Sequence, residues 1–321
     1  MAISYEEAAR LIMGRDNFCI ITHKSPDGDT VGSGFGLYYA LTEIGKNACV
    51  LCSDDFPKKF KTLYNGYENK RFTPKFFIAV DIADTQLIGN DLKKYADYID
   101  LCIDHHASNT NYAKNVLLEA DAAAAAEVVY KLLRAGDMPV TQKTAECLYT
   151  GIVTDTGCFK YPSVTVQTHR IAAELMEIGI SYADINRMMF DTKSKGRIAA
   201  ENYVQNKTEY YLDERCAFCA LSKETIDNIS SDSEDFDELA ALTIQLESVE
   251  VGILVKEKEK GKFRISIRSS KNVNVSEICS EYGGGGHFNA AGCTIDGRIE
   301  DVRMMLIKSV GQTLGIDLWM V

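Results

Sequence analysis

Short apolar runs alternate with helix-compatible stretches through the first half of the chain, and this alternation leaves few folds open. The runs cover residues 17–22, 48–52, 75–80 and 98–103. Helical patterns precede or follow them, beginning after Ser4 and ending near Leu41, and again over residues 122–133 and 142–153. Strands that alternate with helices are typical of a parallel sheet covered by helices. We therefore predict an α/β chain with an N-terminal, doubly wound and mostly parallel sheet domain.

The second half of the chain has a different pattern. Residues 181–206 are charged and helix-compatible, after which we expect strands at 210–212, 216–221, 249–255 and 263–267 and helices near 235–246 and 299–314. We interpret the charged stretch 256–261 as a solvated hairpin turn and expect no regular structure over 282–287. This predicts a smaller C-terminal α/β domain with a mixed sheet. The expected divisions are a catalytic domain 1–186, a helical linker 187–207 and a substrate-binding domain 208–321.

The bulk composition limits the partners. The 321 residues carry a net charge of −11, which argues against a protein that works on duplex DNA. A short anionic substrate can still be held by local cations or metal ions. Ten cysteines without a disulfide-like framework or a signal peptide favour reduced thiols and a cytoplasmic location. The apolar runs are too short for a membrane span.

Two pairs of cysteines have the C-x-x-C spacing of zinc or redox sites, Cys49 with Cys52 and Cys216 with Cys219. Both pairs fall in predicted strands, where residues i and i+3 face opposite sides. We interpret them as core cysteines. His169, on a predicted amphipathic helix, is interpreted as structural.

Acidic and imidazole side chains follow four of the predicted elements. They are His23 with Asp27 and Asp29, Asp81, His105, and Asp155. Ligands bind at the carboxyl ends of strands in open α/β sheets, so these side chains are expected to gather at one edge. Four carboxylates and two histidines suit a pair of Mn²⁺ or Mg²⁺ ions better than thiolate-bound Zn²⁺. Two such ions clamp a phosphate for in-line displacement. The alternatives are a plain turn at residues 27–29 and helix caps at Asp81 and Asp155.

These segments resemble the four motifs of the DHH phosphoesterase superfamily. The matching stretches are HKSPDGD at residues 23–29, DIAD at 81–84, DHH at 104–106 and TDTG at 154–157. The far stretch GGGGHFNAAG at 283–292, preceded by Arg268 and Ser269, resembles the glycine-rich motif of the DHH-associated domain. The resemblance spans nearly the whole chain. It is strongest to small members that act as oligoribonucleases (nano-RNases) and as phosphatases on 3′-phosphoadenosine 5′-phosphate.

The resemblance implies a role for each motif residue. It assigns one metal to His23, Asp27 and Asp81, and a second to Asp29, Asp81, His105 and Asp155, with Asp81 as the bridge. Mn²⁺ is the preferred ion and Mg²⁺ the alternative. In the catalytic roles, His106 donates a hydrogen bond to the phosphate and Asp104 orients an imidazole.

A separate set of residues is assigned to substrate binding, with the active site in a cleft between the two domains. The set is Arg268, Gly284, Gly285, Gly286 and His287. Glycines without Cβ atoms let backbone N–H groups approach a phosphate or base, and Arg suits bidentate phosphate contact. The alternative for four glycines is a flexible linker.

The expected activity is hydrolysis of short single-stranded RNA or DNA oligonucleotides to mononucleotides, or of 3′-phosphoadenosine 5′-phosphate to AMP. The alternative is a phosphodiesterase for cyclic di-AMP or its linear product pApA. An inorganic pyrophosphatase or a non-catalytic nucleotide sensor fits less well. Leu87 and the run Ala122–Ala126 depart from the family pattern, so nucleotide preference stays open. Cleavage polarity, the metal in vivo and the oligomeric state, including a homodimer, also stay open.

Overall fold

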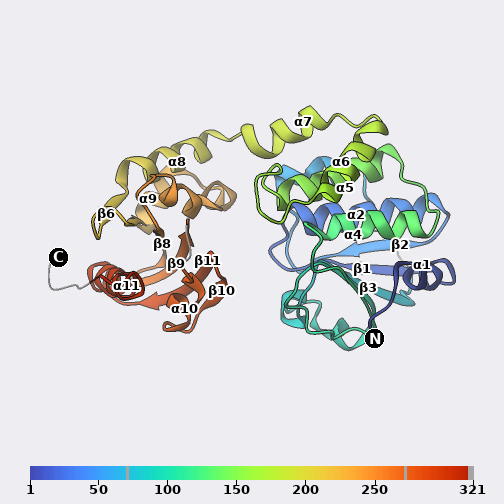
Figure 1. The fold of residues 1–321 in the computed structure, drawn as a ribbon, viewed down its shortest axis with the longest axis horizontal. Helices are drawn as coiled ribbons and strands as arrows, with labels where there is room; N and C mark the ends of the chain where they lie inside the picture. The colour runs from blue at the N-terminus through green and yellow to red at the C-terminus, as the bar shows by residue number, and fades with distance from the viewer. Residues whose placement is uncertain (70–71, 271–272, 317–321) are drawn as a thin grey trace. The chain divides into compact units, whose positions relative to one another are not determined.

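A computed structural model describes residues 1–69, 72–270 and 273–316. The chain divides into two compact units, residues 1–192 and 193–321. Each unit has its own sheet and its own buried apolar cluster (Figure 1). Within the described residues, no helix is both long enough and apolar enough to span a membrane.

The first unit is built on a five-stranded parallel sheet with the order β2-β1-β3-β4-β5. The strands are β1 (Phe18–Ile21), β2 (Ala48–Leu51), β3 (Phe76–Val80), β4 (Ile99–Asp104) and β5 (Asn115–Leu118). The parallel sheet confirms the prediction, although β5 was not expected. The chain runs outward from β1 in both directions, so a switch point lies between β1 and β3.

Seven α-helices and several short turns surround this sheet within the described residues. The α-helices are α1 (Tyr5–Met13), α2 (Gly28–Glu43), α3 (Lys61–Tyr64), α4 (Ala125–Ala135), α5 (Gln142–Asp155), α6 (Val166–Glu177) and α7 (Tyr182–Asn186). The turns are η1 (Lys58–Phe60), η2 (Thr85–Ile88), η3 (Lys93–Tyr98) and the π-helical η4 (Arg187–Asp191). Helices α2, α4 and α5 cover one face of the sheet, and η2 and η3 pack on the other (Figure 1).

Helices α2 and α5 pack unusually closely because glycines face the contact. A Cβ atom on Gly32 would lie 2.4 Å from the carbonyl oxygen of Cys147 and 2.8 Å from the backbone nitrogen of Gly151. A Cβ atom on Gly28 would similarly meet the side chain of Thr154. This contact brings the N-terminal end of α2 beside the C-terminal end of α5.

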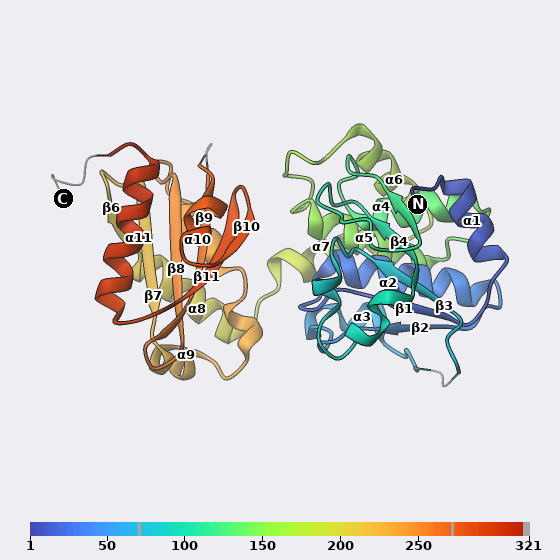
Figure 2. The same cartoon turned by 90° about the horizontal axis from the view of Figure 1, so that it is seen from below.

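The second unit contains a six-stranded mixed sheet with the order β10-β11-β9-β8-β7-β6, as predicted for this half of the chain. The strands are β6 (Glu209–Tyr211), β7 (Cys216–Leu221), β8 (Val251–Glu259), β9 (Lys262–Ser269), β10 (Gly285–His287) and β11 (Ala290–Asp296). Only β7 and β8 pair in parallel among these strands. Helices α8 (Lys195–Lys207), α9 (Lys223–Ile229), α10 (Val275–Ser280) and α11 (Ile299–Thr313) complete the unit (Figure 2).

Three local predictions in this unit are wrong. The charged stretch 256–261 is mostly strand, because β8 and β9 pair through Glu259 and turn only at Lys260 and Gly261, where φ of Gly261 is +74°. The helix expected near 235–246 is replaced by two 3-10 turns, η5 (Ser233–Phe236) and η6 (Leu239–Ile244), separated by Glu238 at φ +56°. The glycine run is partly regular, because Gly285–His287 pairs with β11 as an edge strand.

Helix α8 lies in the segment expected to link the domains, and it packs on the second unit. Its buried residues Ala200 and Val204 share a cluster with Cys219, Leu221 and Leu254. The cysteine interpretation also holds for three of the four residues. Cys49, Cys216 and Cys219 are buried in strands, whereas Cys52 lies just past β2 and donates to the carbonyl of His23 at 3.2 Å. The ring of His169 stacks on Phe159, with centroids 5.0 Å apart.

Candidate active site

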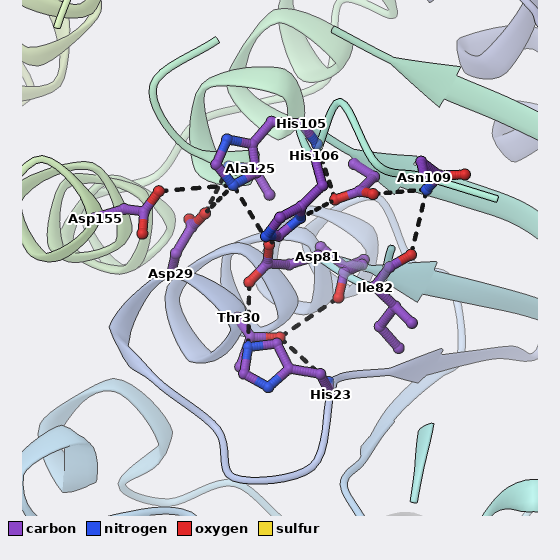
Figure 3. A network of polar contacts seen from close by, with 12 residues as sticks. His23, Asp29, Thr30, Asp81, Ile82, His105, His106, Asn109, Ala125 and Asp155 are labelled. Atoms are coloured by element: carbon purple, nitrogen blue, oxygen red, sulfur yellow. Dashed lines mark hydrogen bonds and ion pairs between the residues drawn. The ribbon is translucent and has the colours of Figure 1, made fainter. Parts of the chain in front are cut away.

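The acidic and imidazole residues predicted from the sequence gather at the carboxyl edge of the first sheet (Figure 3). His23 follows β1, Asp81 follows β3, and Asp104 ends β4, and these three strands are neighbours. Asp27 is the N-cap of α2, and Asp29 lies in its first turn. Asp155 is the last residue of α5, so the close contact between α2 and α5 brings it to the same place.

Asp81 lies at the centre of this group. Its Oδ2 is 3.4 Å from Nε2 of His23, and its Oδ1 is 3.6 Å from Nε2 of His105. The carboxylate is buried, and Oδ1 has no hydrogen-bond partner among the described residues. The backbone is strained at this point, with φ at +60°, and the Asp81 N–H donates to the carbonyl of Ile103. A buried, unpartnered carboxylate oxygen is costly unless a cation or donor satisfies it.

Asp29 is held by backbone groups from another helix. The N–H groups of Ala125 and Ala126 donate to its two carboxylate oxygens at 2.6 and 2.9 Å. The N-cap of α4 is Ala124, which has no side chain to satisfy these amides. Asp29 therefore caps α4 from a distance. Sequence reasoning missed this contact, although a helix start without a capping side chain is a recognisable signal.

The two adjacent histidines have different partners. The Nδ1 atom of His105 lies 3.1 Å from the carbonyl of Ala122, an arrangement that directs Nε2 toward Asp29, Asp81 and Asp155. The Nδ1 atom of His106 lies 2.8 Å from Oδ1 of Asp104. The run before Glu127, where the chain departs from the family pattern, thus supplies contacts through its backbone.

Asp104 is fully buried and is itself held in place. The side-chain amide of Asn109 donates to its second oxygen at 2.6 Å and to the carbonyl of Ile82 at 3.3 Å. The Asp104–His106 contact is the one expected of an orienting carboxylate. The role of Asn109 was not predicted from the sequence, because an asparagine in a loop carries no distinctive pattern.

Electrostatics at this edge favour added positive charge. Burial, reinforced by the negative charge of Asp81, raises the pKa of Asp29 well above its usual range. Burial likewise raises the pKa of Asp155 to about 6. Burial opposes charge on His23, but its contacts with Asp27 and Asp81 outweigh that effect and raise its pKa to about 11. Crowded carboxylates that hold protons in the absence of cations are suited to bind divalent ions.

Three groups of residues have ligand atoms close enough to share an ion, with all atoms of a group within 4.8 Å of one another. The groups are His23, Asp27 and Asp81; Asp29, His105 and Asp155; and Asp81, His105 and His106. Oxygen and imidazole ligands of this kind suit Mn²⁺ and Mg²⁺. The donor set and the unpartnered oxygen of Asp81 therefore fit the metals expected from the sequence.

The predicted substrate-binding residues lie in the second unit. Arg268, Gly284 and Gly285 line one pocket there, and Arg268 on β9 stands opposite Ala290 on β11. Gly286 lies in β10, as does the backbone of His287, whose side chain falls outside the described part of the chain. A Cβ on Gly284 would lie 2.2 Å from the carbonyl of Gly292, so packing against β11 already requires this glycine.

A parallel sheet with aspartates and histidines at its carboxyl edge, followed by a mixed-sheet unit with a glycine-rich loop, is the arrangement of a DHH-type phosphoesterase. Residues 17–152 match the N-terminal domain of the DHH family, and residues 225–314 match the DHHA1 domain. The chain belongs to the DHH family and is a hydrolase that acts on phosphoester bonds.

Individual relatives agree with this assignment. The chain is 30% identical over 285 residues to the bifunctional oligoribonuclease and PAP phosphatase NrnA of Thermus thermophilus, a match that covers 87% of this chain and 84% of the relative. An exopolyphosphatase-related protein from Bacteroides fragilis has a similar structure, with a TM-score of 0.85, 25% identity and coverage of 97% and 95% of the two chains. RecJ of Thermus thermophilus, solved with Mn²⁺, shares the fold at a TM-score of 0.57 and 13% identity, over 98% of this chain and 55% of RecJ.

Proposed function

We propose that this enzyme hydrolyses short oligoribonucleotides to mononucleotides and converts 3′-phosphoadenosine 5′-phosphate to AMP. The Thermus thermophilus relative, which aligns over most of both chains, is named for these two activities. We further propose that two divalent ions serve the reaction and that Mn²⁺ is preferred over Mg²⁺. The overlapping groups of aspartates and histidines support two positions that share Asp81.

The observation that carries this proposal is the environment of Asp81. One oxygen faces His23 and the other faces His105, so the carboxylate has a different set of neighbours on each side. The side chain is 3% exposed, and Oδ1 has no hydrogen-bond partner among the described residues. Such a carboxylate has the features expected of a group that joins two ions.

The residues around the metals have separable tasks. Bound ions would neutralise phosphate charge and activate water. His106 would hold a proton for the phosphate, because its contact with Asp104 outweighs burial and raises the pKa of the imidazole to about 9. Asp104 would keep the ring oriented, and Asn109 would keep Asp104 in place. A protonated imidazole donates a hydrogen bond that strengthens as negative charge builds on the phosphate.

The test compares substrates and one matched pair of variants. Purified protein with Mn²⁺ is offered a labelled dinucleotide, 3′-phosphoadenosine 5′-phosphate, pApA, cyclic di-AMP and pyrophosphate. We expect the first two to be hydrolysed. Asp81→Asn should lose Mn²⁺ binding, measured by calorimetry, and lower the rate roughly a thousandfold, since metal ions contribute several kcal/mol to such reactions.

The control is Asp84→Asn. Asp84 lies three residues away in the same motif, caps η2 by accepting from Gln86, and belongs to none of the candidate metal groups. Asparagine caps a helix about as well as aspartate, so this variant should keep both binding and turnover. Faster hydrolysis of cyclic di-AMP than of the dinucleotide would favour the alternative substrate. Absence of turnover on every substrate, with Mn²⁺ bound, would refute the proposal.

A further inference from the structure

We infer that Arg264 forms a second phosphate-binding position in the pocket of the second unit, next to the position at Arg268, and that it binds the longer members of an oligonucleotide series. The inference rests on the proposed function and concerns substrate length. The recognised ligand is the repeating phosphate of a single-stranded nucleotide chain.

Strand geometry aligns the two arginines. Residues two apart in a strand face the same side, so Arg264, Ser266 and Arg268 of β9 share one face of the sheet. Their partners on β11 are Thr294, Gly292 and Ala290, all of which are small. Arg264 and Arg268 are four residues apart and thus about 13 Å apart along the strand, which is comparable to two steps between successive phosphates of an extended nucleotide chain. The face therefore offers polar side chains at a regular interval beside small residues.

A single pocket joins the two arginines. It has a volume of about 830 Å³ and is lined by Arg264, Ser266 and Arg268 along one side and by residues 283–285 of the glycine run along another. Figure 2 shows the strands concerned, with β9 between β8 and β11. This volume is within the range of small-ligand sites, and a ligand bound near Arg268 would find Arg264 in the same cavity.

Arg264 is an exposed cation beside a second cation. The side chain is exposed, and it makes no hydrogen bond or ion pair with any residue that the structure describes. Its neighbour across the strand pair is another cation, Lys256 on β8. Burial lowers the pKa of Lys256 to about 8, Asp237 opposes this effect, and the positive charges of Lys258 and Arg264 add to it. The Lys256 ammonium donates to the carbonyl of Phe236, so Arg264 is the exposed cation of the two, and an exposed cation in a pocket attracts an anionic ligand.

Substrates of different length distinguish the role of Arg264 from the role of Arg268. A 5′-phosphorylated dinucleotide and 3′-phosphoadenosine 5′-phosphate each have two phosphates one nucleoside apart, too close together to occupy the positions at Arg264 and Arg268, which lie about 13 Å apart along the strand. A tetranucleotide has phosphates far enough apart to occupy both positions. Replacement of Arg264 should therefore weaken binding of the longer chain and leave binding of the shorter ligands unchanged.

The experiment measures binding and turnover of a dinucleotide and a tetranucleotide by the full-length chain. Binding is followed by fluorescence anisotropy of end-labelled oligonucleotides with metal chelated, so that it does not depend on turnover. Arg264→Ala should weaken tetranucleotide binding and raise its KM about 5- to 10-fold, as expected for one exposed contact to a charged group. The affinity and the KM for the dinucleotide should stay within about twofold of those of the wild type. Arg264→Lys should recover most of the affinity, because it keeps the charge.

Lys262→Ala is the matched control. Lys262 is an exposed cation on the same face of β9, two residues before Arg264, and it is outside the pocket lining. Its removal should leave both oligonucleotides unaffected. The salt dependence adds a second readout, since loss of one phosphate contact should reduce the slope of log affinity against log salt by about 0.7 for a single strand.

Two results would overturn the inference. One is an equal loss for both oligonucleotides in Arg264→Ala, which would place Arg264 in the same position as Arg268. The other is unchanged tetranucleotide binding. Failure of the wild-type chain to hydrolyse either oligonucleotide would instead refute the proposed function, while the binding measurements would still decide the role of Arg264.

Discussion

Replacing Gly32 by alanine should weaken both the first unit and its metal site. Gly32 lies within α2, where the helix faces backbone atoms of α5. The new Cβ atom would lie 2.4 Å from the carbonyl oxygen of Cys147 and 2.8 Å from the nitrogen of Gly151. Both obstacles are backbone atoms, so the two helices must move apart by roughly 1 Å to restore ordinary contact.

The magnitude follows from two opposing effects. Alanine in a helix interior is favoured over glycine by about 1 kcal/mol. Overpacking costs about 1–3 kcal/mol, and the upper end of about 3 kcal/mol applies here because both obstacles are backbone atoms. We expect a net loss of about 2 kcal/mol, which lowers the melting temperature of a unit of this size by about 4–8 °C. Separation of the helices also moves Asp29 away from Asp155, so Mn²⁺ affinity should fall roughly tenfold.

Differential scanning calorimetry and calorimetric Mn²⁺ titration measure the two effects. Gly36→Ala is the control, because it lies in the same helix and gains the same propensity, but its Cβ would meet the side chain of Leu148 at 2.6 Å. That side chain can shift, so the net change should stay below about 1 kcal/mol. If Gly32→Ala had the same melting temperature and the same Mn²⁺ affinity as the wild type, this account of the helix contact would be wrong.

Two further predictions concern pH. Without metal, Asp155 has its pKa raised to about 6, chiefly by burial. The folded state then binds more protons than the unfolded state between about pH 4 and 6, so the metal-free chain loses stability as pH rises through this window. Mn²⁺ should therefore raise the melting temperature more at pH 7.5 than at pH 5.5, and an equal rise at both would contradict the assignment. Lys256 has its pKa lowered from 10.5 to about 8 by burial, so its charge destabilises the fold at neutral pH by at most roughly 3 kcal/mol, and this cost is relieved between about pH 8 and 10.5. Lys256→Met should melt higher than wild type at pH 7, with a difference that shrinks by pH 10; a constant difference would show that the charge is not the cause.

Local patterns in the sequence were enough to define four of the five strands of the first sheet and the residues at its edge. Apolar runs of four to six residues gave β1, β2, β3 and β4, because a fully buried strand requires apolar side chains on both faces. The position of His23, Asp81 and Asp104 after such runs then implied a common edge, since parallel strands all end on the same side. Segments with weaker apolar patterns were not predicted as strands. Strand β5 depends on its parallel pairing with β4, which local residues do not reveal, and the glycines of β10 carry no apolar alternation, although its partner β11 begins only three residues after β10 ends.

What the sequence determined by itself is the kind of side chain at each position and the order of the elements. It placed the aspartates and histidines in the chain and identified Arg268 and the glycine run. Tertiary packing decided which atoms meet. Asp29 accepts from the amides that begin α4, Asp155 reaches the site through the glycine contact between α2 and α5, and Arg264 shares a pocket with Arg268. The contacts of Asp29 and Asp155 join elements distant in the chain, and the pocket at the two arginines is completed by the glycine run and β11, so only the close packing of complete elements creates these sites.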